Sequence, residues 1–152
     1  KASIDQSFGM LSQYIEVCPE NIWVETSGGW PVWQQVYHAI TAVGFFTNSA
    51  DAAPAETLVE EKFCGLQMPA PENIVVTREE MKTALAQALQ DIEALVATLD
   101  DSELTDRNEG LYARAKFEMT MAGTLTMLAA HTLYHLGSCD AALRNHGIPG
   151  VF

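Results

Sequence analysis

The sequence predicts an all-α fold, a four-helix bundle formed by a single domain over residues 1–152. Three observations support this prediction. Four segments repeat apolar residues at spacings of three and four, the period of one helix face. Two of these segments begin with a capping-box pattern, a common start of a helix. Strand signals are weak, because the β-branched run at residues 73–77 is short and lies beside prolines.

The first two helices are predicted over residues 3–17 and 31–47. Ser3 and Gln6 form an S-x-x-Q pattern at the start of the first helix, in which each side chain accepts a backbone N–H bond near the helix start. Pro31 opens the second helix, since proline suits a first helical turn. This second helix is apolar on most sides, so we expect neighbouring elements to bury several of its faces.

The third and fourth helices are predicted over residues 77–99 and 117–145. The third begins with a T-x-x-E capping box, and the fourth ends at Gly147, a residue type that commonly terminates helices. The apolar residues of the third helix follow the seam pattern of a bundle: Met81, Leu85, Ala88, Ile92, Leu95 and Leu99. Two interpretations of residues 100–116 remain open: they extend the fourth helix backward, or they contain a short helix of their own.

Charge and cysteine content exclude several classes of function. The formal net charge is -12 and no basic cluster is present, so the surface repels nucleic-acid phosphates and anionic lipid headgroups. The sequence also lacks an apolar run of about 18 to 20 residues that could span a membrane. Cys18, Cys64 and Cys139 are odd in number and widely spaced, which argues against a disulfide framework. We therefore expect a cytoplasmic protein whose partners are neither nucleic acids nor membranes.

Three histidines are candidate metal ligands. His131 and His135 are four positions apart on the fourth predicted helix, a spacing of about 6 Å along the axis and about 40° around it. Both imidazoles can therefore reach one ion. His38 lies in the middle of the apolar second helix, where an unpaired imidazole would be costly to bury. Three histidines leave a coordination position open, which is typical of a reactive site. The alternative is that these histidines are packing residues.

Two regions of the chain resemble the DinB/YfiT-like superfamily. The first consists of the sequences PENIW (residues 19–23) and WPVWQQVYH (residues 30–38). The second is HxxxHLGS followed by LRNHG, within residues 131–147. The resemblance implies a four-helix bundle, commonly dimeric, that binds a divalent metal through His38, His131 and His135. Zinc, nickel or iron(II) would suit such imidazole ligands.

The resemblance also implies a class of activity. Characterised relatives include thiol-dependent S-transferases and an isomerase that uses a low-molecular-weight thiol. We therefore expect a metal-dependent enzyme of small-molecule metabolism, S-transferase-like or hydrolase-like, with a small molecule such as a thiol as its partner. The alternative is a non-catalytic bundle that binds an apolar ligand or a protein. One departure concerns Ser138, which stands where the family usually has a glutamine after Gly137.

Several residues near the predicted ligands are further candidates. Cys139 follows His135 by four positions and could be a fourth ligand or a reactive thiol, or simply a small buried side chain. Tyr37 and Tyr134 are adjacent to ligand positions and could donate a proton, or pack with their hydroxyls at the rim.

Acidic residues outside the histidine pattern could orient a ligand imidazole. Glu25 and Glu118 are candidates for this role, whereas Asp140 falls half a turn away from the face of His131. His146, near a helix end, is expected at the surface. Three tryptophans around the start of the second helix either wall a substrate pocket or pack in the core: Trp23, Trp30 and Trp33.

Overall fold

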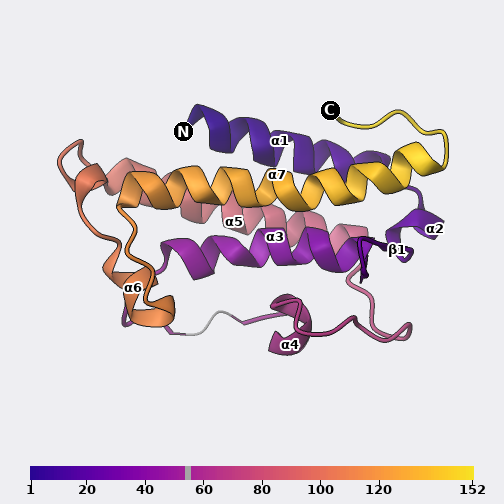
Figure 1. Ribbon diagram of the computed structural model, residues 1–152, viewed down its shortest axis with the longest axis horizontal. Coiled ribbons are helices and arrows are strands. Elements are labelled where there is room, and N and C mark those ends of the chain that lie inside the picture. Colours follow the sequence, from indigo (N-terminus) through magenta and orange to yellow (C-terminus); the bar gives the residue numbers. More distant parts are fainter. Residues whose placement is uncertain (54–55) are drawn as a thin grey trace.

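The computed structural model describes residues 1–53 and 56–152 and confirms the predicted all-α class. Four long helices lie side by side in Figure 1: α1 (Ala2–Val17), α3 (Val32–Thr47), α5 (Arg78–Thr98) and α7 (Met121–Asn145). Helices α1 and α3 each pack against both α5 and α7. That a single domain extends over residues 1–152 stays a prediction.

One hydrophobic core fills the space between the four helices. Helix α1 contributes the stripe expected from its sequence, and α3 buries residues on most of its faces. The largest fully buried side chains include Trp23, Trp33, Tyr14 and Phe8. Helix α3, the apolar helix predicted over residues 31–47, is therefore covered by neighbours on several sides, as its composition predicts.

Helix α5 follows the sequence prediction closely. Thr77 Oγ1 accepts a hydrogen bond from the Glu80 N–H at 3.3 Å, and Glu80 Oε2 accepts one from the Thr77 N–H at 2.9 Å. The predicted capping box is thus confirmed. The seam is buried from Met81 to Ile92, but its last two members, Leu95 and Leu99, are only half-buried.

Other helix starts differ from the prediction. Helix α1 begins at Ala2, so Ser3 lies inside it, and the cap residue Lys1 makes no side-chain capping bond. The S-x-x-Q capping box was therefore wrong. The fourth long helix begins at Met121 instead of residue 117, with Thr120 Oγ1 accepting from the Gly123 N–H.

The stretch before α7 contains a separate short helix, α6 (Glu109–Ala115), capped by Asn108. A single 3₁₀ turn, η1 (Glu103–Thr105), precedes it. The short-helix interpretation of residues 100–116 was therefore the right one. The predicted end of α7 is also confirmed, because Gly147 adopts a positive φ of 72° just after the helix.

A small hairpin precedes α3. Helix α2 (Glu20–Trp23) leads into β1 (Thr26–Ser27), which pairs antiparallel with β2 (Trp30–Pro31). The two-residue turn consists of Gly28 and Gly29, whose φ values of 60° and 94° favour glycine. Pro31 thus ends this hairpin and precedes α3, instead of lying in its first turn. The weak strand signals did not predict this pairing.

The connection from α3 to α5 carries one short helix, α4 (Glu61–Cys64), which packs on α3. Residues 54 and 55 of this connection lie outside the described residues. All three cysteines are buried free thiols. Among the described helices, none combines the length and apolar character that a membrane crossing requires.

Candidate metal centre

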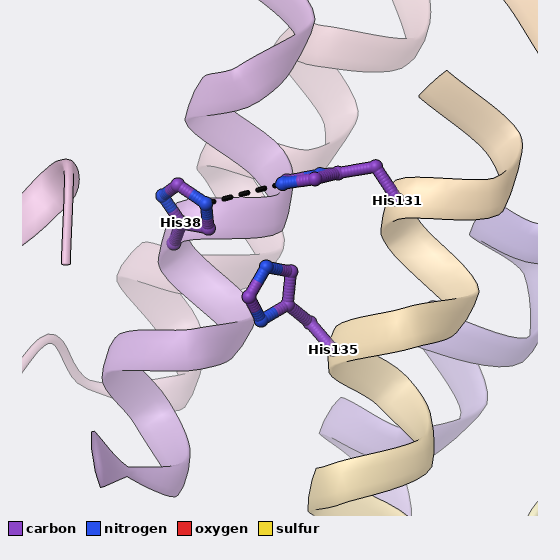
Figure 2. Close-up of side chains that lie close together, drawn as sticks. All are labelled: His38, His131 and His135. Atoms are coloured by element: carbon purple, nitrogen blue, oxygen red, sulfur yellow. Dashed lines mark hydrogen bonds between the residues drawn. The ribbon is translucent and has the colours of Figure 1, made fainter. Parts of the chain in front are cut away.

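The three histidines predicted as ligands lie together between α3 and α7. His38 comes from α3, His131 and His135 come from consecutive turns of α7, and the three rings converge in Figure 2. One nitrogen from each ring lies within 4.8 Å of the others. The Nε2 atoms of His38 and His131 are 3.2 Å apart.

The packing of α7 explains this convergence. Leu128, Thr132 and Leu136 are fully buried and face the core. His131 and His135 are adjacent to this buried stripe, at its border, and His131 remains half-buried while His135 is almost covered. Because α3 is in contact with α7, imidazoles at this border reach His38 on the neighbouring helix.

Burial keeps the three imidazoles neutral. It lowers the pKa of His131 to about 4, with a further contribution from the neighbouring His38. It lowers the pKa of His135 to about 3, helped by His38 and His131. Burial also lowers the pKa of His38, although the carbonyl of Cys64 opposes that effect. At neutral pH all three rings are therefore uncharged, which is the form that binds metal ions.

A backbone carbonyl orients His38. Its Nδ1 lies 2.6 Å from the carbonyl oxygen of Cys64 in α4. A carbonyl can only accept, so Nδ1 donates the proton and Nε2 keeps its lone pair. That lone pair faces His131. Metal-binding histidines are commonly held in this way through their second ring nitrogen.

Gln34 holds the segment that carries this carbonyl. This side chain is fully buried on α3, one turn before His38. Its Nε2 donates to the carbonyls of Phe63 and Met68 at 3.0 and 2.9 Å, and its Oε1 accepts from the Ala70 N–H at 2.8 Å. This role is not predicted from the sequence, where the available signal is the adjacent pair Gln34 and Gln35 within a mostly apolar helix.

The residues present fit a divalent transition metal ion. His131 Nδ1 is buried without a hydrogen-bond partner among the described residues, so protein groups do not satisfy this ring fully. The 3.2 Å between the two Nε2 atoms is close to the separation of about 3.4 Å that two ligands have around tetrahedral zinc. The cluster offers only imidazole nitrogens, which suit zinc, nickel or iron better than magnesium or calcium.

The neighbouring thiol and hydroxyl candidates lie outside this cluster. Cys139 is fully buried, its Sγ contacts the Val32 carbonyl at 3.8 Å, and burial raises the pKa of its thiol. It is therefore a packing residue. The Tyr37 hydroxyl is buried and accepts from the Leu58 N–H at 2.8 Å, whereas Tyr134 is 76% exposed beside His135.

The acidic candidates have other partners. Glu25 Oε2 lies 2.6 Å from Nε2 of His146, which is a surface residue as predicted. Glu118 lies near Arg107. Asp140 binds Arg144 at 2.7 Å and is unconnected to the histidines. Among the described residues, a backbone carbonyl, that of Cys64, and not a carboxylate, holds the second ring nitrogen of a candidate ligand.

The tryptophans divide between the core and a cleft. Trp23 and Trp33 are buried, and Trp23 Nε1 donates to the Val76 carbonyl at 2.9 Å. Trp30 instead lines a cleft of about 330 Å³ that is also lined by His135. The residues lining this hairpin cleft are Gly28, Trp30, Gln35, Tyr134, His135 and Ser138.

Comparisons with known proteins agree with this fold. The DinB superfamily model matches residues 3–139. A DinB-like protein from Bacillus cereus ATCC 10987, known from a crystal structure, is similar in fold at a TM-score of 0.67 and 18% sequence identity; the match covers 96% of this chain and 91% of that chain. None of the curated proteins matches. Since the family match extends over most of the sequence, the chain belongs to the DinB superfamily.

Proposed function

We propose that this protein is a metal-dependent enzyme of small-molecule metabolism. In this proposal His38, His131 and His135 hold one zinc, nickel or iron(II) ion. The observation that supports it is the convergence of three neutral imidazoles from two helices, with their nitrogens within 4.8 Å of one another. Three protein ligands leave at least one coordination position for a substrate or water, as in catalytic metal sites.

A bound ion would supply Lewis-acid chemistry, which lowers the pKa of a thiol or water at the open position. The chain's own groups prepare the site. The Cys64 carbonyl keeps the proton of His38 on Nδ1, and burial keeps His131 and His135 unprotonated. The hairpin cleft leads to His135 and gives a small molecule access from solvent.

The specific reaction we propose is S-transferase-like, with a low-molecular-weight thiol as the partner, or hydrolase-like, with water in its place. Both follow from what the resemblance to the family implies. A homodimer and a reducing, cytoplasmic setting belong to the same proposal. The buried free thiols are compatible with that setting.

Elemental analysis of protein purified without a histidine tag tests the metal centre. We expect about one equivalent of a transition metal in the wild type and almost none in His131→Ala, because two remaining imidazoles make a weak site. His146→Ala is the matched control, since this histidine lies at the surface and pairs with Glu25. Absence of metal in the wild type after reloading with zinc and nickel would favour the non-catalytic bundle.

Activity requires a separate assay. Metal-loaded protein should consume an electrophile in the presence of a small thiol, and His135→Ala should lose this activity together with the metal. Hydrolysis of an ester or amide without thiol would indicate the hydrolase-like reaction instead. Background rates in both assays, with metal bound, would contradict the enzymatic part of the proposal.

A further inference from the structure

The hairpin cleft begins at His135 and extends about one helical turn beyond the histidine cluster. Gln35 precedes His38 by three positions on α3, and Ser138 follows His135 by three positions on α7. These two helices run in opposite directions, so both displacements point toward the hairpin end of the bundle (Figure 1). The cleft is therefore continuous with the histidine cluster, and His135 belongs to both.

The carboxamide of Gln35 is fixed in one orientation. Gln35 is only 2% exposed, and its Nε2 donates to the carbonyls of Ser27 and Trp30 at 2.7 and 3.2 Å. Both amide hydrogens are thus used within the hairpin. Its Oε1 has no hydrogen-bond partner in the part of the chain that the structure describes, although the residue lines the cleft. Gln35 therefore presents an unused acceptor from a rigid position.

The hairpin wall of the cleft is held against α7. Ser27 Oγ donates to the Ser138 carbonyl at 2.9 Å. A Cβ atom at Gly28 would approach Ser138 Oγ to 2.6 Å, so the glycine allows this close contact as well as the turn. Because these contacts hold the wall before any ligand arrives, the cleft is preformed.

The cleft has no ionised lining. Its six residues are neutral in a chain whose net charge is -12. A charged group placed there would lose hydration without gaining a counter-ion, which is costly. The rings of Trp30 and Tyr134 instead offer apolar surface that suits a planar group.

We propose that the hairpin cleft binds the uncharged end of the substrate, a planar or aromatic group that carries an N–H or O–H donor. Gln35 Oε1 accepts the hydrogen bond from this donor, and Trp30 and Tyr134 contact the ring. The assignment of this group as part of a substrate rests on the proposed function, because it places the group beside His135. Its binding does not require the metal.

Three related probes test this inference on the metal-free, ¹⁵N-labelled protein: benzamide, N,N-dimethylbenzamide and benzoate. Binding is followed by NMR, through the indole signal of Trp30 and the side-chain amide signal of Gln35. We expect saturable shifts with benzamide. Dimethylbenzamide, which has no N–H, should bind about tenfold more weakly. Benzoate, which is charged, should not bind measurably, because the cleft has no cation to pair with it.

Variants locate the site. Gln35→Met removes the acceptor and should reduce benzamide affinity about tenfold. This change also removes two hairpin bonds, so signal dispersion is checked first. Tyr134→Ala is a second variant, because the Tyr134 side chain is exposed and its loss leaves the core intact. This variant should reduce benzamide affinity several-fold, because it removes the contact with the ring. Phe117→Ala, an exposed aromatic outside the cleft, is the matched control and should bind as the wild type does.

The outcomes separate this inference from the proposed function. Equal binding of benzamide and dimethylbenzamide, or unchanged affinity in both Gln35→Met and Tyr134→Ala, would overturn it. If the wild type binds metal but not benzamide, the inference about the cleft is overturned, whereas the proposed metal centre is supported. Benzamide binding that depends on Gln35, in a protein that binds no metal, would support the cleft as a binding site and reject the metal-dependent function.

Discussion

Helix α5 and the connection that precedes it differ in how much their sequences reveal. Helix α5 has a capping box, which the structure confirms, and a periodic apolar seam, which is buried from Met81 to Ile92. It contributes no residue to the histidine cluster. The α4 connection, residues 56–76, has one short helix and no apolar period. It nevertheless supplies the carbonyl that orients His38.

This difference has a physical cause. Capping and periodicity depend on residues close in sequence, so they can be recognised without a tertiary structure. The contact between the Cys64 carbonyl and His38 joins residues 26 positions apart through a backbone atom. Every residue type has a backbone carbonyl, so the identity of the side chain at position 64 does not indicate this contact. A region with weak local signals can therefore control the geometry of a site.

The largest effect is expected for Gln34→Ala, which breaks the link between the α4 connection and α3. Three hydrogen bonds would be lost, one of them buried and two partly buried, which costs about 2 to 4 kcal/mol of stability. Metal affinity should fall about 10- to 100-fold, because His38 loses its orienting carbonyl. Urea unfolding and chelator competition measure the two effects.

Gln87→Ala on α5 is the matched control for this prediction. Gln87 is exposed, and its side-chain Nε2 donates to Asp91 Oδ1 at 2.9 Å, so its loss should change stability by less than about 0.5 kcal/mol. Unchanged metal affinity in a folded Gln34→Ala protein would show that the α4 connection does not govern the site.

Lowering the pH should reduce the free energy of unfolding mainly through the histidine cluster, and less through α5. In the metal-free protein, the pKa values of His131 and His135 are lowered to about 4 and about 3, from 6.5. The unfolded chain therefore binds protons first as pH falls below 6.5. The free energy of unfolding should therefore fall as the pH is lowered from 6.5 to about 3, by on the order of a few kcal/mol.

Urea unfolding of chelated protein at a series of pH values measures this decline. His135→Gln should make it shallower, because one depressed group is removed. An equal slope in the variant and the wild type would contradict the assignment of this pH dependence to the cluster.

The smallest effect is expected for Thr77→Ala, which removes the capping box of α5. The loss of the Thr77 Oγ1 bond to the Glu80 N–H should cost about 1 kcal/mol. Metal affinity should stay the same, since α5 contributes no candidate ligand. A thermal melt and a metal titration of the same sample test both statements. A change in metal affinity would mean that α5 supports the site indirectly.

The errors at helix starts have a common cause: patterns of neighbouring side chains do not show how the backbone before a helix is paired. The fourth long helix was predicted from residue 117, but Met121 is its first residue because the preceding backbone pairs elsewhere. The Met119 carbonyl accepts from the Asn108 N–H at 2.8 Å, and the Met121 N–H donates to the Asp106 carbonyl at 2.9 Å. These pairings lie across a short helix and are invisible in the pattern of side chains.

The candidate site combines both kinds of information. The four-residue spacing of His131 and His135 was sufficient to predict two imidazoles on one face of a helix, because helical geometry is local. The approach of His38 depended on the packing of α3 against α7, and its orientation depended on the fold of the α4 connection. The hairpin cleft likewise requires β2, α3 and α7 together. Amino-acid order thus indicated the four long helices and all three candidate ligands, whereas long-range packing and backbone hydrogen bonds decided how the histidines and the cleft come together.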